Sequence, residues 1–230
     1  HYHLTDGDPV AEKYYKDVWT TKVHLKKGYT SIYEFSWEDY YIYMLVHLAK
    51  HIKLGGSGIR SIIDIKIFLD KKKEELNWDY VKEELKKLHL SQFEYWMRQL
   101  SEVWFGTEKT TPLYDELTEF IVDSGTYGTI KNYHASHVVE LGGKNQNLSV
   151  GKIRSKLEII FLPYEGMQEQ YLYLEKFPFL LPVAWIQRIF RTIVWRKDKI
   201  TSTLQSTNIE QDRLEKVKKV MDALELFESD

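Results

Sequence analysis

Hydrophobic residues recur at intervals of three and four along most of the chain, which is the spacing of amphipathic helices. One helix is expected to start after Ser36, because a hydroxyl followed three residues later by Asp39 resembles an N-terminal capping box, and to end at Gly55. The residues that give this helix its period are Tyr40, Met44, Leu45, His47, Leu48 and His51. Further helices are expected from about residue 57 into the charged run 70–75, and over about 77–88, 91–105, 112–122, 182–196 and 208–227.

The sequence contains no series of alternating apolar and polar residues joined by hairpin turns. The predicted fold is therefore mainly α, a multi-helix bundle with at most a short strand remnant at the N-terminus, where residues 1–4 alternate. Residues 142–149 are polar and glycine-rich, as is typical of a linker. The predicted organisation is a helical part at residues 1–141 and a C-terminal helical extension at residues 150–230 that packs on it.

The composition narrows the classes of function. The 230 residues include 32 Lys and Arg against 34 Asp and Glu, so no global positive field favours binding to nucleic acid. The absence of cysteine excludes disulfides and thiolate chemistry and favours a cytoplasmic location. No apolar run approaches the ~20 residues of a membrane-spanning helix. The aromatic share of 14% is large enough to build a substantial core.

The densest group of reactive side chains surrounds a glycine-rich turn. His47 and His51 precede the turn and lie one helical turn apart, and Arg60 and Asp64 follow it with the same spacing. One interpretation is an anion site, in which backbone N–H groups of residues 55–58 approach a phosphate, and Lys50, Arg60 and the positive end of the second helix add charge. A second is a metal site made by His47, His51 and Asp64. In a third, Arg60 pairs with Asp64 and the histidines fill a helix interface.

Two other motifs give weaker evidence of a functional site. Gly56 and Ser57, followed by Asp64, imitate the Gly-Ser…Asp-x-Asp motif of nucleotidyl transfer, but Lys66 stands where the second carboxylate would bind the metal. Residues 124–129 are also glycine-rich, yet they lack the lysine and the spacing of a P-loop. A helix end followed by a turn is the simpler interpretation of this second segment.

The segment 182–199 is amphipathic, with apolar residues on one side and arginines on the other. Such a helix can lie on a membrane surface. It can equally pack on the core of its own protein and leave a solvated basic face.

Several of these motifs, in their order along the chain, resemble the uncharacterised bacterial nucleotidyltransferase family. They are residues 36–44, 47–51, 55–64, 77–79, 105–106, 124–129 and 177–182. That family is similar to the polymerase-beta-type nucleotidyltransferases, which join an N-terminal α/β catalytic half to a C-terminal helical half. This chain resembles the helical half, because the Gly-Ser…Asp-x-Asp motif of the catalytic half does not occur in its sequence.

The resemblance implies the helical portion of a nucleotidyltransferase, which recognises the phosphate of a nucleotide or an acceptor. It favours the anion site, with the expected contacts Lys50, His51, Ser57 and Arg60, and with His47 and Asp64 orienting them. It implies no cofactor in this chain and no metal ligands, with Mg²⁺ expected only if an upstream catalytic domain is a partner. The alternatives are a non-catalytic interaction or regulatory protein and the His/His/Asp metal site.

Overall fold

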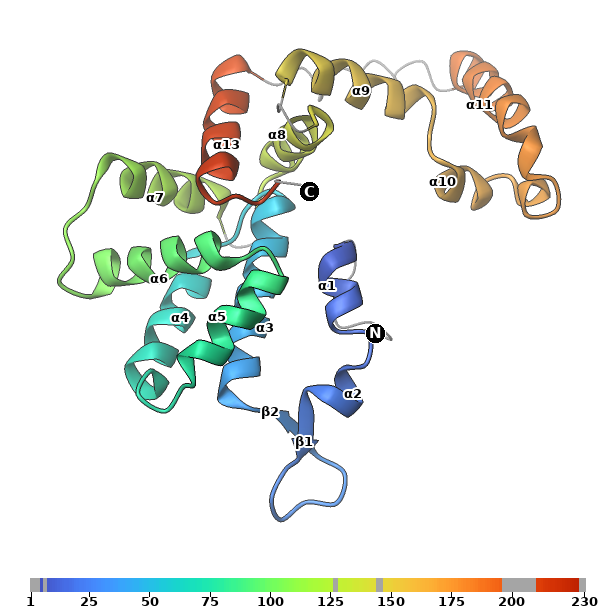
Figure 1. Ribbon diagram of the computed structural model, residues 1–230. Helices are drawn as coiled ribbons and strands as arrows, with labels where there is room; N and C mark the ends of the chain where they lie inside the picture. The colour runs from blue at the N-terminus through green and yellow to red at the C-terminus, as the bar shows by residue number, and fades with distance from the viewer. Residues whose placement is uncertain (1–4, 6–7, 126–127, 144–146, 196–209, 228–230) are drawn as a thin grey trace. The chain divides into compact units, whose positions relative to one another are not determined.

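The computed structural model describes residues 5, 8–125, 128–143, 147–195 and 210–227, most of which are helical (Figure 1). This confirms the predicted mainly α fold. The chain forms two compact units, of which unit 1 comprises residues 1–133 and 219–230 and unit 2 comprises residues 134–218. The division that composition suggests, with a linker at 142–149, stays a prediction.

Unit 1 contains most of the elements. They are α1 (Pro9–Tyr14), α2 (Val18–Thr21), β1 (Val23–Leu25), β2 (Tyr33–Phe35), α3 (Trp37–Lys53), α4 (Ile59–Lys72), α5 (Trp78–Lys87), α6 (Ser91–Phe105) and α7 (Pro112–Ser124). Local caps explain why the helices start where the sequence indicates. The Ser36 hydroxyl accepts a hydrogen bond from the Asp39 N–H, the Asn77 side chain accepts one from the Tyr80 N–H, and Pro112 occupies the first turn of α7.

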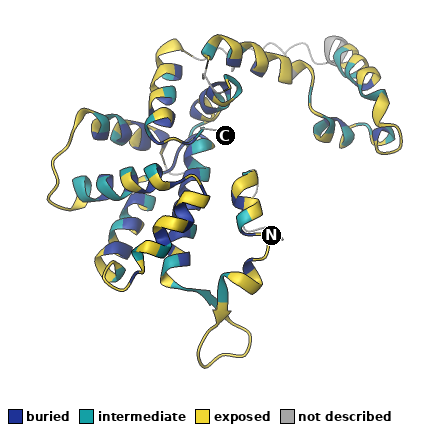
Figure 2. Ribbon diagram, viewed as in Figure 1, coloured by how far each residue is buried: buried dark blue, intermediate teal, exposed yellow. Residues whose placement is uncertain are grey.

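The core of unit 1 lies between α3, α4, α5 and α6. Helix α4 packs against α6, and α3 packs against α5, so that their buried faces meet (Figure 2). Tyr41 of α3 is fully buried and stacks on Phe68 of α4, with ring centroids 5.5 Å apart. Its hydroxyl donates to Glu94 Oε1 at 2.9 Å, and Arg98 Nε donates to the same oxygen at 2.7 Å. The buried carboxylate is thereby hydrogen-bonded and paired with a cation, as a buried charge requires.

Several elements were not expected from the sequence, among them a small sheet and one helix. The strands β1 and β2 form a two-stranded antiparallel sheet with Val23 opposite Phe35 and Leu25 opposite Tyr33, and three-residue strands are too short to establish an alternating period. The expected strand remnant at residues 1–4 lies outside the described residues. Helix α8 (Ile130–Leu141) was missed because its buried face includes polar residues, Asn132 and Ser136, so the apolar stripe is interrupted.

Unit 2 contains the rest of α8, the start of α13 (Gln211–Ala223) and the elements between them. These are α9 (Leu148–Ile160), α10 (Tyr164–Gln168), η1 (Leu172–Glu175), η2 (Pro178–Leu180) and α11 (Leu181–Trp195). Helix α9 lies close against α8, since a Cβ on Gly151 would be 1.9 Å from the Val138 carbonyl oxygen. A separate small core forms around Met167, Leu174 and Ala184.

A buried lysine attaches the N-terminal elements to α3 and α5. The Lys22 side chain is only 12% exposed, and its Nζ donates to Glu84 Oε2 at 2.9 Å and to Tyr80 Oη at 2.8 Å. Asp39 Oδ1 lies 3.4 Å from the same nitrogen. Burial alone would lower the pKa of Lys22, but hydrogen bonds to Tyr14, Tyr80 and Glu84 outweigh it and raise this pKa above its ordinary value. The ammonium is therefore charged and holds two carboxylates together.

The carboxylate of Glu84 is stabilised in its charged form. Burial would raise its pKa, but hydrogen bonds from Lys87, Tyr14 and Lys22 lower it to about 2. Since the folded-state pKa lies below the unfolded value of 4.5, the stabilisation from this group is present above pH 4.5 and is lost as the pH falls toward 2.

We predict that Lys22→Met destabilises the protein by about 3 kcal/mol at pH 7, because Asp39 and Glu84 would stay buried without their cation. Lys27→Met, at an exposed position of the loop between β1 and β2, serves as the control and is expected to change stability by less than ~0.5 kcal/mol. Urea unfolding at pH 7 measures both. Equal unfolding midpoints for the two variants would contradict a structural role for the buried lysine.

Candidate functional site

The glycine-rich turn that the sequence singled out ends α3 in the left-handed conformation. Gly55 and Gly56 have φ values of +112° and +117°. The Gly55 N–H donates to the Ile52 carbonyl at 3.2 Å, and the Gly56 N–H donates to the His51 carbonyl at 2.9 Å. These bonds satisfy carbonyl groups that the end of a helix leaves without partners.

The second glycine-rich segment packs directly on this turn. A Cβ added to Gly55 would be 2.8 Å from the Tyr133 nitrogen, and one added to Gly56 would be 2.0 Å from Ser124 Oγ. The Thr129 N–H donates to the Gly55 carbonyl at 3.3 Å, and a Cβ on Gly128 would be 2.8 Å from the Gly55 carbonyl carbon. Close contact between two backbones is therefore the reason for glycine at these positions.

Two residues that sequence reasoning missed hold this contact. Ser124 Oγ donates to the Phe120 carbonyl at 2.6 Å and accepts from Asn132 Nδ2 at 3.1 Å. Ser124 and Asn132 are both almost fully buried. No local pattern signals this pairing, because the segment reads as an ordinary helix end and its partner glycines lie about seventy residues earlier.

The packing changes the expected anion site. The N–H groups of Gly55 and Gly56 bond to carbonyls of α3, so they do not cradle a ligand. Helix α4 begins after Gly58, and because glycine has no side chain, no side-chain hydrogen bond caps the start of this helix. Within the described part of the chain, the N–H groups of Ile59 and Arg60 have no backbone acceptor. The donors that remain for an anion are in the first turn of α4, where the helix dipole is positive.

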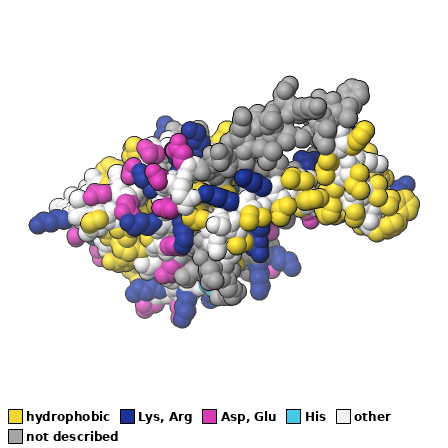
Figure 3. Space-filling view, turned by 90° about the horizontal axis from the view of Figure 1, so that it is seen from above, with side chains coloured by type: hydrophobic (Ala, Val, Ile, Leu, Met, Phe, Trp, Pro, Cys, Tyr) yellow, Lys and Arg dark blue, Asp and Glu magenta, His cyan; other side chains and the backbone are white. Residues whose placement is uncertain are grey.

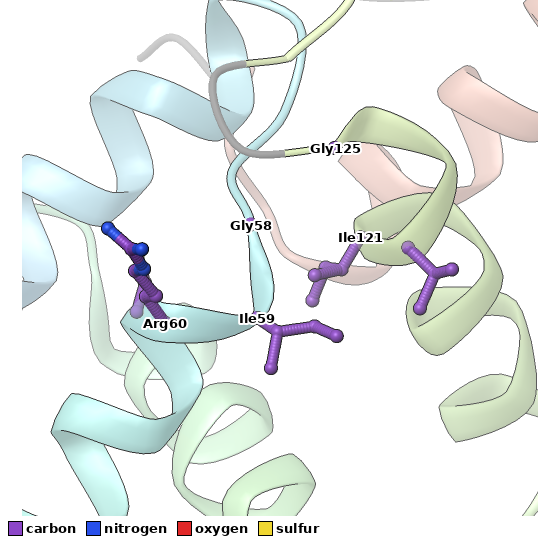
Figure 4. Close-up of a pocket in the computed structure, with 7 residues that line it drawn as sticks. Gly58, Ile59, Arg60, Ile121 and Gly125 are labelled. Carbon is purple, nitrogen blue, oxygen red and sulfur yellow. The ribbon is translucent and has the colours of Figure 1, made fainter.

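A pocket of about 300 Å³ lies between the start of α4 and the end of α7. Its lining residues are Gly58, Ile59, Arg60, Ser61, Ile121, Val122 and Gly125. Figure 4 shows Ile59 and Ile121 on the two sides of this space, whereas the Arg60 side chain extends away from both. Two opposite walls of the pocket are therefore apolar, and the Arg60 guanidinium points away from them.

The two histidines of α3 form a neutral pair. His47 Nε2 and His51 Nε2 are 3.0 Å apart, which is hydrogen-bond distance with one ring donating to the other. Burial lowers the pKa of His47, and the charges of His51 and Lys50 lower it further. Burial and Lys50 likewise lower the pKa of His51. At pH 7 the pair is therefore mostly neutral and can both donate and accept hydrogen bonds.

The other predicted site residues occupy the start of α4. Ser57 is buried, and its hydroxyl lies 2.7 Å from the Ser61 hydroxyl. Arg60 and Asp64 are exposed, and no ion pair between them is found among the described residues, so the pairing expected in the structural interpretation is wrong. Lys50 is half-buried on the last turns of α3.

The metal interpretation lacks its ligand set. Among the described residues, no group of three or more His, Asp or Glu side chains is placed to hold a metal ion. His47 and His51 meet, but Asp64 does not join them. The residues that resemble a catalytic carboxylate pair do not form one. Asp64 lies on a helix, and at the position of the second carboxylate the Lys66 ammonium lies 3.2 Å from Glu102 Oε1.

Comparison with known proteins supports part of the resemblance. Residues 1–106 match the model of a family described as uncharacterised nucleotidyltransferase. This range includes α3, α4 and all six predicted site residues, and over it the chain is similar to that family. No curated protein and no solved structure matches the chain.

We predict that Gly56→Ala destabilises unit 1 by roughly 3 kcal/mol, since the positive φ and the overlap with Ser124 Oγ both oppose a Cβ. Gly28→Ala is the matched control, because Gly28 also has a positive φ but has no atom within 4 Å of an added Cβ, and about 1 kcal/mol is expected. Urea unfolding compares them. Adding Ser124→Gly to Gly56→Ala is expected to recover part of the loss, and an equal cost at the two glycines would contradict the packing argument.

We predict that the histidine pair makes the protein less stable in mild acid. The folded-state pKa values of His47 and His51 lie below 6.5, so the unfolded chain binds more protons and stability falls as the pH drops through 6.5. In His47→Gln/His51→Gln, the loss of stability between pH 7.5 and 5.5 is expected to be smaller, as measured by unfolding at several pH values. Parallel pH profiles for the two proteins would refute this assignment.

Proposed function

We propose that this chain is the helical, substrate-recognising portion of a nucleotidyltransferase, and that the start of α4 binds a phosphate of the nucleotide or of the acceptor. The observation that carries the proposal is Arg60. This side chain is exposed, belongs to the residues matched by the nucleotidyltransferase family model, and has no ion-pair partner among the described residues. It stands beside backbone N–H groups that have no acceptor in the described fold.

An arginine suits this role because its guanidinium can grip a phosphate with two parallel hydrogen bonds. The first turn of α4 adds backbone donors and the positive end of the helix dipole. The neighbouring pocket, with Ile59 and Ile121 on its walls, offers an apolar surface for the uncharged part of the same ligand. A nucleoside phosphate combines these two chemistries.

The remaining residues have supporting roles in this proposal. Lys50 adds positive charge from the end of α3, and neutral His51 offers a hydrogen bond rather than a charge. Ser57 holds the start of α4 through Ser61. His47 holds the ring of His51 through the hydrogen bond between them. Asp64, one turn after Arg60 on α4, orients the groups that face the ligand.

Mg²⁺, which nucleotidyl transfer uses to activate the attacking oxygen, is not assigned to these residues. Among the described residues, no three His, Asp or Glu side chains are grouped to hold a metal ion, so this part of the chain offers no such ligand set for Mg²⁺. In this proposal the metal and its carboxylates belong to a catalytic domain that acts together with this chain.

We predict that Arg60→Ala weakens the binding of ATP by roughly 10- to 100-fold, the size expected for losing hydrogen bonds to a charged group. Isothermal titration of the full chain with ATP, CTP, GTP, UTP and pyrophosphate measures this and ranks the ligands. Lys71→Ala is the matched control, because Lys71 is an exposed cation at the opposite end of the same helix.

The Lys71 variant is expected to bind within about two-fold of the unaltered protein, and circular dichroism checks that all variants are folded. Unchanged affinity in Arg60→Ala, or an equal loss in both variants, would refute the phosphate site. Binding of pyrophosphate without a preference for any nucleoside would limit the site to the phosphate and leave the pocket without a role.

A further inference from the structure

The two histidines of α3 form a contact that the fold does not require. The rings of His47 and His51 meet edge to face, with their centroids 4.5 Å apart and their Nε2 atoms 3.0 Å apart. His47 is exposed and His51 is half-buried, so the pair is accessible to solvent. Among the described residues, no other hydrogen bond of either ring is found. A single bond between accessible side chains one turn apart stabilises a helix only slightly.

Aromatic side chains hold the histidine pair from one side. Tyr43, one turn before His47, has its ring centroid 5.9 Å from that of His47. Tyr43 in turn stacks on Phe35 of β2 at 5.7 Å and meets the buried ring of Tyr15 edge to face at 6.1 Å. The His47 ring therefore lies against an ordered aromatic column, and the His51 ring lies against His47. Ligand groups that are already held in place lose less conformational entropy on binding.

The separation of the two Nε2 atoms fits one class of metal geometry. Imidazole nitrogens bind a metal ion at about 2.0–2.1 Å. Since the two nitrogens are 3.0 Å apart, an ion at this distance from both has a nitrogen–metal–nitrogen angle of roughly 91–97°. Neighbouring ligands of a square-planar or octahedral ion make this angle, whereas the nitrogens of a tetrahedral ion would be about 3.3–3.4 Å apart. A small rotation of each ring directs both lone pairs at one ion, which then replaces the hydrogen bond between the rings.

We propose that His47 and His51 chelate one divalent transition-metal ion, of which Cu²⁺ and Ni²⁺ best match this angle. Each ring ligates through Nε2 and keeps its one proton on Nδ1. Mg²⁺ prefers oxygen ligands and does not suit the pair. The chelate does not need Asp64, and water fills the other positions of the ion, because no third His, Asp or Glu joins the pair among the described residues. This site is separate from the proposed phosphate site and does not rest on it.

The charges near the pair allow a bound cation. Burial and then neighbouring charge lower the pKa of both histidines, so at pH 7 the rings are mostly in the neutral form that binds metals. His51 lies in the last turn of α3, where the negative end of the helix dipole favours a cation. Lys53 is paired with Asp8 at 2.9 Å, whereas the Lys50 ammonium opposes the ion.

The wider surface adds no strong attraction for a cation. Positive and negative side chains are interspersed over the face shown in Figure 3, and the formal net charge of the chain is only −2. No broad field of one sign therefore draws a metal ion to the protein. The two nitrogen ligands themselves select the ion, which favours a transition metal over Mg²⁺ or Ca²⁺.

Isothermal titration of the full chain with Ni²⁺ tests the proposal. We expect His47→Gln/His51→Gln to bind one equivalent less than the unaltered protein, and His47→Gln alone to weaken that equivalent by at least about 10-fold, because one of two ligands is lost. Lys50→Gln is expected to tighten it by roughly two- to five-fold, since a partly screened repulsion is removed. With Cu²⁺, the difference between the electron paramagnetic resonance spectra of the unaltered protein and the double variant is expected to show splitting from two imidazole nitrogens.

The matched control is His134→Gln/His137→Gln, which removes the same number of histidines from another helix, α8. His137 Nε2 already lies 2.7 Å from Glu158 Oε2, so this control is expected to keep the Ni²⁺ equivalent with an affinity within about two-fold. Circular dichroism checks that every variant is folded. An unchanged stoichiometry in His47→Gln/His51→Gln, or an equal loss in the two double variants, would overturn the proposal. Tighter binding of Zn²⁺ than of Ni²⁺ by the pair would overturn the assigned geometry.

Discussion

The candidate site depends on one steric constraint, the close approach of Gly56 to Ser124. A Cβ at Gly56 would overlap the serine hydroxyl, so the turn after α3 can pass the end of α7 only because glycine has no side chain. Helix α4 begins at Ile59, three residues after Gly56, and its first turn lies across the pocket from Ile121. The same constraint removes the glycine N–H groups from the ligand, because the turn uses them to end α3. The backbone donors available to a phosphate are therefore those in the first turn of α4, the helix that follows the loop.

The charged residues of unit 1 are used in two different ways. Lys22 is buried among two carboxylates and two tyrosine hydroxyls, where an unpaired charge would be costly, and it holds the N-terminal elements on α3 and α5. Arg60 is exposed and forms no ion pair with another described residue, so the fold does not use its charge in a salt bridge. A cation that the fold does not use is a better candidate for ligand binding than one that the fold requires.

The proposed phosphate site draws on two stretches of unit 1, the start of α4 and the end of α7. The proposed phosphate contacts lie within residues 1–106, where similarity to the nucleotidyltransferase family is found, whereas Ile121 on the pocket wall lies beyond that range.

The sequence by itself determined the class of fold and most helix boundaries, because caps at Ser36 and Asn77 and the apolar period act within one or two turns. It also identified the residues around Arg60 as a group. Only the tertiary structure decided how that group is arranged: His47 and His51 pair, Arg60 and Asp64 do not, and the second glycine segment closes on the first. The contact between the two glycine-rich segments, like the partners of Lys22, depends on residues tens of positions apart, which no local pattern encodes.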